Sequence, residues 1–282
     1  MDPRIEKIGS DRWIGFGRAS SVLHRMVLLM ETPRQTRMPG LIVYGSSGIG
    51  KTMIANRMAS QFPPVYDELG GVTRRPLLLF QAPPAPDERR FYLHILATIG
   101  APQTPSRTLA EIEIRTLAFL REIGPKMIVI DEVHNLLAGT YREQRRFLNV
   151  LRYLTNDLQT SLVCFGVNEA VDAIRGDTQL ARRVDEHHLP QWEDDLEFSQ
   201  LIQTLIQAME LERPSTLGVR SLRRLLTVKG GVTSRIFSTI RELSIDAIES
   251  GEERITDEAV EGWRPRWHRT LSVDYTPHPA DF

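Results

Sequence analysis

The sequence contains a single cysteine, no long apolar run and no excess of charge of either sign. With Cys164 alone, the chain cannot form an intramolecular disulfide, so we expect a reducing, cytoplasmic location. The most apolar early run, residues 22–30, includes His24 and Arg25 and is too short to span a bilayer. The first residues, MDPRIEK, lack the pattern of a signal peptide. The sequence therefore gives no indication of a membrane partner.

Positive and negative charges almost cancel, with 35 lysines and arginines against 36 aspartates and glutamates. Any contact with nucleic acid must therefore come from a local basic surface rather than from overall charge. Zinc-ligand spacings and the signatures of zinc fingers, homeodomains and RNA-recognition motifs are missing, so we do not expect sequence-specific reading of DNA. The hydrophobic share of 41% and the charged share of 25% are typical of a globular protein.

Short apolar runs alternate with helix-like segments through the first two thirds of the chain. The runs predict buried strands at residues 41–44, 77–81, 127–131 and 161–166, with a short fifth strand at 186–189. Helices are expected at residues 20–30, 52–60, 87–99, 108–123 and 142–157. This alternation predicts an α/β fold in which a parallel sheet is sandwiched between helices.

From about residue 193 the pattern becomes wholly helical. We therefore predict three parts: residues 1–190 as an N-terminal segment and α/β core, residues 191–262 as a small all-α domain, and residues 263–282 as a tail. The tail begins with WRPRWHR, which mixes aromatic and basic residues. It either binds nucleic acid or a partner protein, or it is an irregular terminus.

A glycine-rich segment, GSSGIGKT at residues 45–52, matches the pattern G-x-x-x-x-G-K-[ST] in full and lies between a predicted strand and a predicted helix. Its glycines let the backbone wrap so that N–H groups point at a phosphate, and the following helix presents its positive end to the same anion. Lys51 then reaches the β- and γ-phosphates, while the hydroxyl of Thr52 ligates Mg2+. We predict an ATP–Mg2+ site with nucleotide contacts from Gly45, Ser46, Ser47, Gly48, Ile49, Gly50, Lys51, Thr52 and Met53.

A second motif, MIVIDE at residues 127–132, ends in two carboxylates at the carboxyl end of a predicted strand, where ligands bind in open α/β sheets. Asp131 is expected to hold the magnesium shell, and Glu132 to orient or deprotonate the attacking water. The alternative is that both acids cap the helix that follows. His134 is more typical of a polar packing residue, or of a support for its neighbours, than of a catalytic group.

Further along the chain, polar residues at strand and helix boundaries are candidates for sensing phosphate. Asn168 follows the fourth predicted strand, where it would contact the γ-phosphate or the attacking water, or serve as a turn residue. Arg182 and Arg183 precede the short fifth strand; an arginine here would project into a neighbouring subunit's site, or the pair forms a solvated turn. Arg235 begins a helix of the second domain and either leans over the γ-phosphate or lies on the helix surface.

The long helix predicted at residues 142–157 has two faces, with an apolar stripe from Phe147 to Leu158. The arginines that fall almost opposite this stripe are Arg142, Arg145, Arg146 and Arg152. They form either a solvated face or a surface for DNA phosphates, whose binding would depend steeply on salt. The other basic candidates for DNA contact are Arg89, Arg90 and the pair Arg107 and Thr108.

Several stretches of the sequence resemble a known family. They are WIGFGRA (13–19), RMPGLIVYGSSGIGKT (37–52), MIVIDEVHNLLAGTYREQRRFLNVLRYLTNDL (127–158), LVCFGVNEA (162–170) and DTQLARRVDEHHLPQW (177–192). A P-loop, the DE of the second motif, an arginine before the last strand and a helical lid with Gly-x-x-x-Arg together resemble the AAA+ ATPases. Within that class the chain looks like the TniB/TnsC family of transposition ATPases, closest in appearance to TniB.

The resemblance implies a P-loop AAA+ core with a small helical lid, and an ATP-dependent regulator of DNA transposition in the bacterial cytoplasm. Such a protein would assemble as a homo-oligomer, a ring or a helical filament, on double-stranded DNA without sequence preference. It would recruit or activate a DDE transposase, together with a target-selection protein. Its ATP hydrolysis would be slow and stimulated by DNA and by the oligomer.

The resemblance also assigns roles to single residues: Walker A for Lys51 and Thr52, Walker B for Asp131 and Glu132, sensor 1 for Asn168, arginine finger for Arg183, sensor 2 for Arg235, and adenine contact for Trp13 and Ile14. Many AAA+ finger motifs read Arg-Phe, whereas Val184 follows the arginine doublet here. Either Arg182 or Arg183 is therefore a candidate for the finger.

Other functions fit the same motifs. One is an initiator-type helicase loader of the DnaC/IstB kind, which would bind a replicative helicase instead of a transposase. Another is an oligomeric adaptor that binds ATP with negligible hydrolysis, and the presence of Glu132 argues against it. A small-molecule kinase is a further possibility, but the sequence shows no sign of an acceptor pocket.

Overall fold

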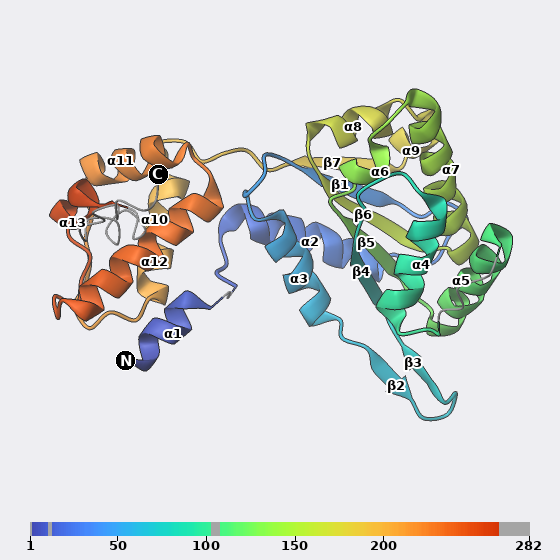
Figure 1. Cartoon of the computed structure of the whole chain (residues 1–282), viewed down its shortest axis with the longest axis horizontal. Helices are drawn as coiled ribbons and strands as arrows, with labels where there is room; N and C mark the ends of the chain where they lie inside the picture. The colour runs from blue at the N-terminus through green and yellow to red at the C-terminus, as the bar shows by residue number, and fades with distance from the viewer. Residues whose placement is uncertain (1, 11–12, 103–107, 265–282) are drawn as a thin grey trace, which may run out of the picture. The chain divides into compact units, whose positions relative to one another are not determined.

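The computed structural model describes residues 2–10, 13–102 and 108–264. The chain divides into two compact units (Figure 1). One unit lies within residues 17–190, and the other combines the described residues up to residue 16 with residues 191–264. Because the second unit is built from both ends of the sequence, the first unit is inserted within it.

The unit of residues 17–190 is organised around a five-stranded parallel sheet in the order β4-β5-β6-β1-β7. Its strands are β1 (Gly40–Tyr44), β4 (Leu77–Gln81), β5 (Met127–Asp131), β6 (Ser161–Gly166) and β7 (Val184–His188). Every residue of β5 and β6 is buried, as expected for strands covered on both faces. The predicted α/β fold with a parallel sheet is confirmed.

Helices cover both faces of this sheet. They are α2 (Gly17–Glu31), α3 (Lys51–Gln61), α4 (Glu88–Ile99), α5 (Leu109–Ile123), α6 (His134–Leu137), α7 (Tyr141–Leu158), α8 (Asn168–Arg175) and α9 (Thr178–Ala181). In Figure 1, α2 and α3 lie on one side of the sheet and α4, α5 and α7 on the other. Alternate strand residues, such as Ile128 and Ile130, share one core cluster with α4, α5, α7 and α8.

The second unit is entirely helical within its described residues. It contains α1 (Pro3–Gly9), α10 (Leu196–Ala208), α11 (Val219–Lys229), α12 (Thr233–Glu249) and α13 (Asp257–Gly262). Its core gathers aliphatic and aromatic side chains around Trp192, whose indole Nε1 donates a hydrogen bond to Thr233 Oγ1 at 2.9 Å.

The N-terminal segment was predicted together with the α/β core, as residues 1–190, whereas its described residues up to residue 16 fall within the helical unit. Ile8 and Ile14 are buried in the core of the helical unit, with 2% and 8% of their surface exposed. Arg4 donates to both carboxylate oxygens of Glu253, at 2.7 and 2.9 Å. These contacts connect positions far apart in the sequence, which local sequence patterns do not indicate.

Helices α1, α6, α8 and α9 and one hairpin were not predicted. Helix α1 begins at the N-cap Asp2, whose carboxylate accepts from the Arg4 backbone N–H at 2.8 Å. An antiparallel hairpin of β2 (Val65–Asp67) and β3 (Val72–Arg74) follows α3 and projects from the α/β unit in Figure 1. Among the described residues, no helix combines the length and apolar character needed to cross a membrane.

Candidate nucleotide-binding site

The glycine-rich loop connects the end of β1 to the start of α3, as predicted from residues 45–52. Gly48 and Gly50 have φ values of 76° and 105°, in the left-handed region that favours glycine. At Gly45 the requirement is space, because a Cβ there would lie 2.3 Å from the carbonyl oxygen of Leu189. Two different constraints, torsion and close approach, therefore select glycine within one short loop.

Lys51 is the first residue of α3, and only 5% of its surface is exposed. Its ammonium donates to the carbonyl oxygens of Gly45 at 2.7 Å and of Ser46 at 3.0 Å. Burial lowers the pKa of this ammonium, whereas the negative charges of Glu132 and Asp131 act in the opposite direction. A buried cation held by two loop carbonyls is placed where the oxygens of a polyphosphate would be more favourable partners.

Thr52 and Asp131 meet between α3 and the carboxyl end of β5. The Thr52 hydroxyl donates to Asp131 Oδ2 at 2.6 Å, and Asp131 Oδ1 accepts from the Glu132 backbone N–H at 2.9 Å. Hydroxyl and carboxylate oxygens suit Mg2+, which commonly takes few protein ligands and completes its shell with water and phosphate. The described residues contain no cluster of three or more His, Cys, Asp or Glu that would hold a metal alone. The oxygen donors of Thr52 and Asp131 fit a magnesium ion bound together with a nucleotide.

Glu132 follows Asp131 with an unusual backbone conformation, a φ of 55°. Its carboxylate Oε2 lies 3.1 Å from His134 Nε2. Helix α6 begins after Val133 without a side-chain cap, so neither acid serves as the cap considered in the sequence analysis. The structure thus brings Lys51, Thr52, Asp131 and Glu132 to one edge of the sheet.

A family model described as "Bacterial TniB protein" matches residues 4–194, more than half of the chain. The chain belongs to the TniB family. No curated protein matches it.

The chain also resembles solved structures at low sequence identity. The ORC2 protein of Aeropyrum pernix in its ADP form is 16% identical over 91% of this chain and 71% of that one, with a TM-score of 0.61. The ORC1 protein of the same organism, in complex with DNA, is 16% identical over 95% and 70%, with a TM-score of 0.62. Domain III of the Thermotoga maritima replication initiation protein DnaA is 15% identical over 88% and 91%, with a TM-score of 0.51. These likenesses confirm the predicted AAA+ fold.

Asn168 is the first residue of α8 and is exposed. It follows β6, the strand that pairs with β1, so it lies at the same edge of the sheet as the P-loop. Its assignment as a phosphate sensor stays a prediction.

Arg182 and Arg183 have different surroundings. Arg183 is half-buried and donates to Asn156 Oδ1 at 2.6 Å and to Thr155 Oγ1 at 3.1 Å. Its pKa is lowered, first by burial and then by the positive charges of Arg152 and Arg37. Arg182 is exposed at the end of α9, and its side chain makes no hydrogen bond or ion pair within the described part of the chain. The sequence did not indicate this difference, because the contacts of Arg183 come from α7.

Trp13, Ile14 and Arg235 belong to the helical unit. Ile14 is buried in its core, and Arg235 is exposed in the first turn of α12. The adenine and sensor 2 roles assigned to them by resemblance stay predictions.

The basic residues proposed for DNA contact fall into different structural groups. Arg142, Arg145 and Arg146 are exposed in the first half of α7, with Arg146 ion-paired to Glu88 at 2.6 Å. Arg89 and Arg90 lie in the first turn of α4. Thr108 forms the capping box of α5 with Glu111, which gives it a structural role, and Arg107 lies outside the described residues. Arg152 departs from the predicted exposed face, because it is half-buried and 3.6 Å from the buried Asp177.

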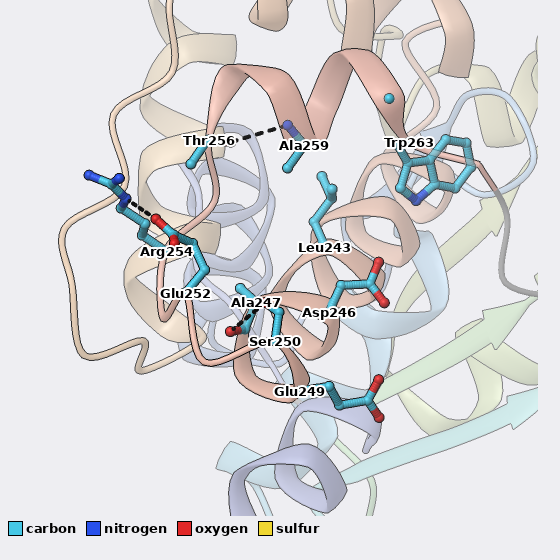
Figure 2. Close-up of a pocket in the computed structure, with 11 residues that line it drawn as sticks. Leu243, Asp246, Ala247, Glu249, Ser250, Glu252, Arg254, Thr256, Ala259 and Trp263 are labelled. Atoms are coloured by element: carbon cyan, nitrogen blue, oxygen red, sulfur yellow. Dashed lines mark hydrogen bonds and ion pairs between the residues drawn. The ribbon is translucent and has the colours of Figure 1, made fainter.

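The helical unit carries a groove of about 640 Å3 between the C-terminal half of α12 and α13 (Figure 2). Its lining includes three carboxylates, Asp246, Glu249 and Glu252. Its arginine, Arg254, is ion-paired to Glu252 at 2.7 Å. An acidic lining repels polyphosphate, so this groove is not a candidate nucleotide site.

Proposed function

We propose that this TniB-family protein is an ATPase that binds ATP with Mg2+ at the P-loop, assembles on double-stranded DNA as a homo-oligomer, and recruits or activates a transposase at a target site in the bacterial cytoplasm. The observation that carries the proposal is the cluster of Lys51, Thr52, Asp131 and Glu132. It combines a phosphate-binding cation, two oxygen ligands for a metal and a candidate base at one edge of the sheet.

On binding ATP, the loop amides and the N-terminal end of α3 would surround the phosphates. Lys51 would exchange the carbonyls of Gly45 and Ser46 for β- and γ-phosphate oxygens. Thr52 and Asp131 would hold Mg2+, which neutralises phosphate charge when bound. Glu132 would orient the attacking water and accept its proton.

A second subunit would complete the site by contributing an arginine finger. Because Arg182 is exposed, we favour Arg182 over Arg183 as the arginine that reaches into the neighbouring subunit's site. Arg183 is held by Thr155 and Asn156 of its own chain, whereas Arg182 has no such contacts among the described residues. We expect Arg182→Ala to leave ATP affinity unchanged and to lower oligomer-dependent turnover by about 1000-fold, the contribution typical of an arginine finger. Arg183→Ala should instead lower the melting temperature, because it leaves Thr155 and Asn156 without this donor. If Arg182→Ala hydrolyses ATP at the wild-type rate, Arg182 is not the arginine finger.

The DNA surface would lie where α4 and α7 begin. The Arg146–Glu88 ion pair connects the two helices, and Gly139, just before α7, lies close to Pro86, just before α4. Helix N-termini disfavour cations, yet Arg89, Arg90 and Arg142 occupy these first turns. Cations and helix N-termini together suit phosphate anions, so this placement is explained better by DNA binding than by helix stability.

Phosphate release in the presence of DNA tests the enzymatic part of the proposal. Glu132→Gln should bind ATP with wild-type affinity and lose at least about 100-fold in turnover, the contribution of a positioned base. Glu122→Gln, an exposed glutamate on α5, is the matched control and should behave as wild type. If wild type and Glu132→Gln release phosphate equally slowly, the protein is an ATP-binding adaptor instead.

Binding of purified partners tests the transposition part. We expect the ATP-bound protein on DNA to bind the transposase of the same mobile element and to leave a replicative helicase unbound. The opposite preference would assign the protein to the helicase loaders.

A further inference from the structure

The imidazole of His134 is placed against the candidate base of the ATPase site. His134 begins α6, three residues after Asp131, and its Nε2 lies 3.1 Å from Glu132 Oε2. A histidine that serves only in packing commonly has both ring nitrogens satisfied when it is largely covered. In the described part of the chain, His134 Nδ1 is buried and has no hydrogen-bond partner. The polar group that the ring contacts is therefore the Glu132 carboxylate, through Nε2.

The backbone around Glu132 fixes the direction of its side chain. The Glu132 N–H donates to Asp131 Oδ1 at 2.9 Å, and its carbonyl accepts from Asn135 N–H at 3.0 Å. The next residue, Val133, donates to the Phe165 carbonyl of β6 at 2.9 Å. These bonds hold Glu132 at a φ of 55°, a conformation that costs about 1 kcal/mol or more for a residue with a Cβ. A strained residue held on both sides by hydrogen bonds is a feature of functional sites.

The two oxygens of the Glu132 carboxylate are not equivalent. Oε2 lies 3.1 Å from His134 Nε2, whereas Oε1 has no hydrogen-bond partner among the described residues. The carboxylate also acts electrostatically on the Lys51 ammonium more strongly than Asp131 does. Since Lys51 marks the position of the β- and γ-phosphates, the remaining oxygen is available to a water on the γ-phosphate side.

We propose that His134 is a positioning residue, which donates from Nε2 to Glu132 Oε2 and so presents Oε1 to the attacking water. This inference rests on the proposed ATPase function and adds a residue to it. His134 acts through Glu132 and makes no contact with nucleotide or metal. Its removal should therefore affect the chemical step and spare the binding of ATP.

Three variants of His134 separate this role from packing. His134→Ala removes the donor, His134→Gln retains an amide N–H at nearly the distance of Nε2, and His134→Asn retains an amide on a shorter side chain. For each we would measure the dissociation constant for ATP–Mg2+, the single-turnover rate of hydrolysis on DNA and the melting temperature. His24→Ala, an exposed histidine of α2, is the matched control.

We expect His134→Ala to bind ATP within about 3-fold of wild type and to hydrolyse it about 10- to 100-fold more slowly, the cost of misplacing a catalytic group. His134→Gln should recover most of the rate, and His134→Asn should recover less. In a Glu132→Gln background, His134→Ala should cause no further loss, because the two residues act as one unit.

The outcomes distinguish failure of this inference from failure of the proposed function. If Glu132→Gln is inactive while His134→Ala hydrolyses at close to the wild-type rate, the positioning role is wrong and the ATPase assignment stands. If Glu132→Gln hydrolyses as wild type, the assignment of the base itself is wrong. Should His134→Ala fail to fold, the comparison of His134→Gln with His134→Asn decides: equal rates would overturn the inference.

Discussion

Lys51 shows how a single buried cation organises the nucleotide site. Its ammonium is held by the carbonyls of Gly45 and Ser46 and lies within the electrostatic influence of Glu132 and Asp131. Hydrogen bonds between charged groups are stronger than those to neutral carbonyls, so phosphate oxygens would displace both partners.

We therefore predict that Lys51→Ala raises the dissociation constant for ATP–Mg2+ by at least about 100-fold, the equivalent of removing two charge-assisted hydrogen bonds. Isothermal titration calorimetry is the measurement. Lys126→Ala, which changes an exposed lysine at the opposite end of β5, is the control and should bind as wild type. Micromolar affinity retained in Lys51→Ala would contradict the phosphate assignment.

At Gly45, glycine is required by the packing of the fold and not by contact with the ligand. A methyl group at this position would overlap the Leu189 carbonyl, which is backbone and has little freedom to move. We predict that Gly45→Ala lowers the free energy of unfolding by about 1–3 kcal/mol, and the melting temperature by several degrees. Gly9→Ala is the control, because a Cβ added at Gly9 would have no heavy atom within 4 Å other than those of its chain neighbours. It should have little effect when the two variants are compared by thermal unfolding.

At the scale of the element, α7 combines a core face with a basic first half. Its arginines near the N-terminal end are opposed by the helix dipole, and Arg142 has no ion-pair partner in the described residues. Charge reversal of Arg142 and Arg145 together should weaken DNA binding and lower the salt slope by about 2, because each arginine would neutralise one phosphate.

The salt dependence of DNA binding, measured by fluorescence anisotropy, checks this prediction. Lys126→Glu, which reverses an exposed charge outside the surface, serves as the control. A slope equal to that of wild type would mean that the arginines of α7 are solvated charge.

Elements with a buried pattern were predictable from the sequence. Strands β4, β5 and β6 have the predicted bounds, because each is a continuous apolar run that ends at a polar residue or glycine. The β2–β3 hairpin was not predicted, because Val65 and Tyr66 are exposed and three-residue strands carry no buried periodicity.

Arg152 was placed on the wrong face, because its partner Asp177 comes from a different part of the chain. The P-loop and the two acids needed only local spacing, whereas the Glu132–His134 contact depends on a backbone torsion that the sequence does not encode visibly.

At the scale of the whole molecule, the packing of the N-terminal segment onto the helical unit depends partly on charge. Arg4 hydrogen-bonds the Glu253 carboxylate and lowers the pKa of that group below its usual value of 4.5. Because the folded pKa is the lower one, ionised Glu253 stabilises the fold above about pH 4.5, and this contribution disappears as the pH falls through the folded pKa.

We predict that Glu253→Gln has a lower melting temperature than wild type at pH 7, and that this difference shrinks as the pH falls below about 4.5 and disappears below the folded pKa of Glu253. Thermal unfolding across that pH range is the measurement. Glu258→Gln, an exposed glutamate on α13, should follow the wild-type curve throughout. A difference that persists in acid would show that the Arg4–Glu253 contact contributes through packing and not through charge.

The insertion of residues 17–190 within the helical unit also affects the order in which the protein can fold on the ribosome. At typical elongation rates these residues take on the order of 10 to 30 s to synthesise. During that time Ile8 and Ile14 have emerged but α10 and α12, which bury them, have not yet been translated. The nascent chain can therefore complete its P-loop unit before Ile8 and Ile14 meet the helices that bury them.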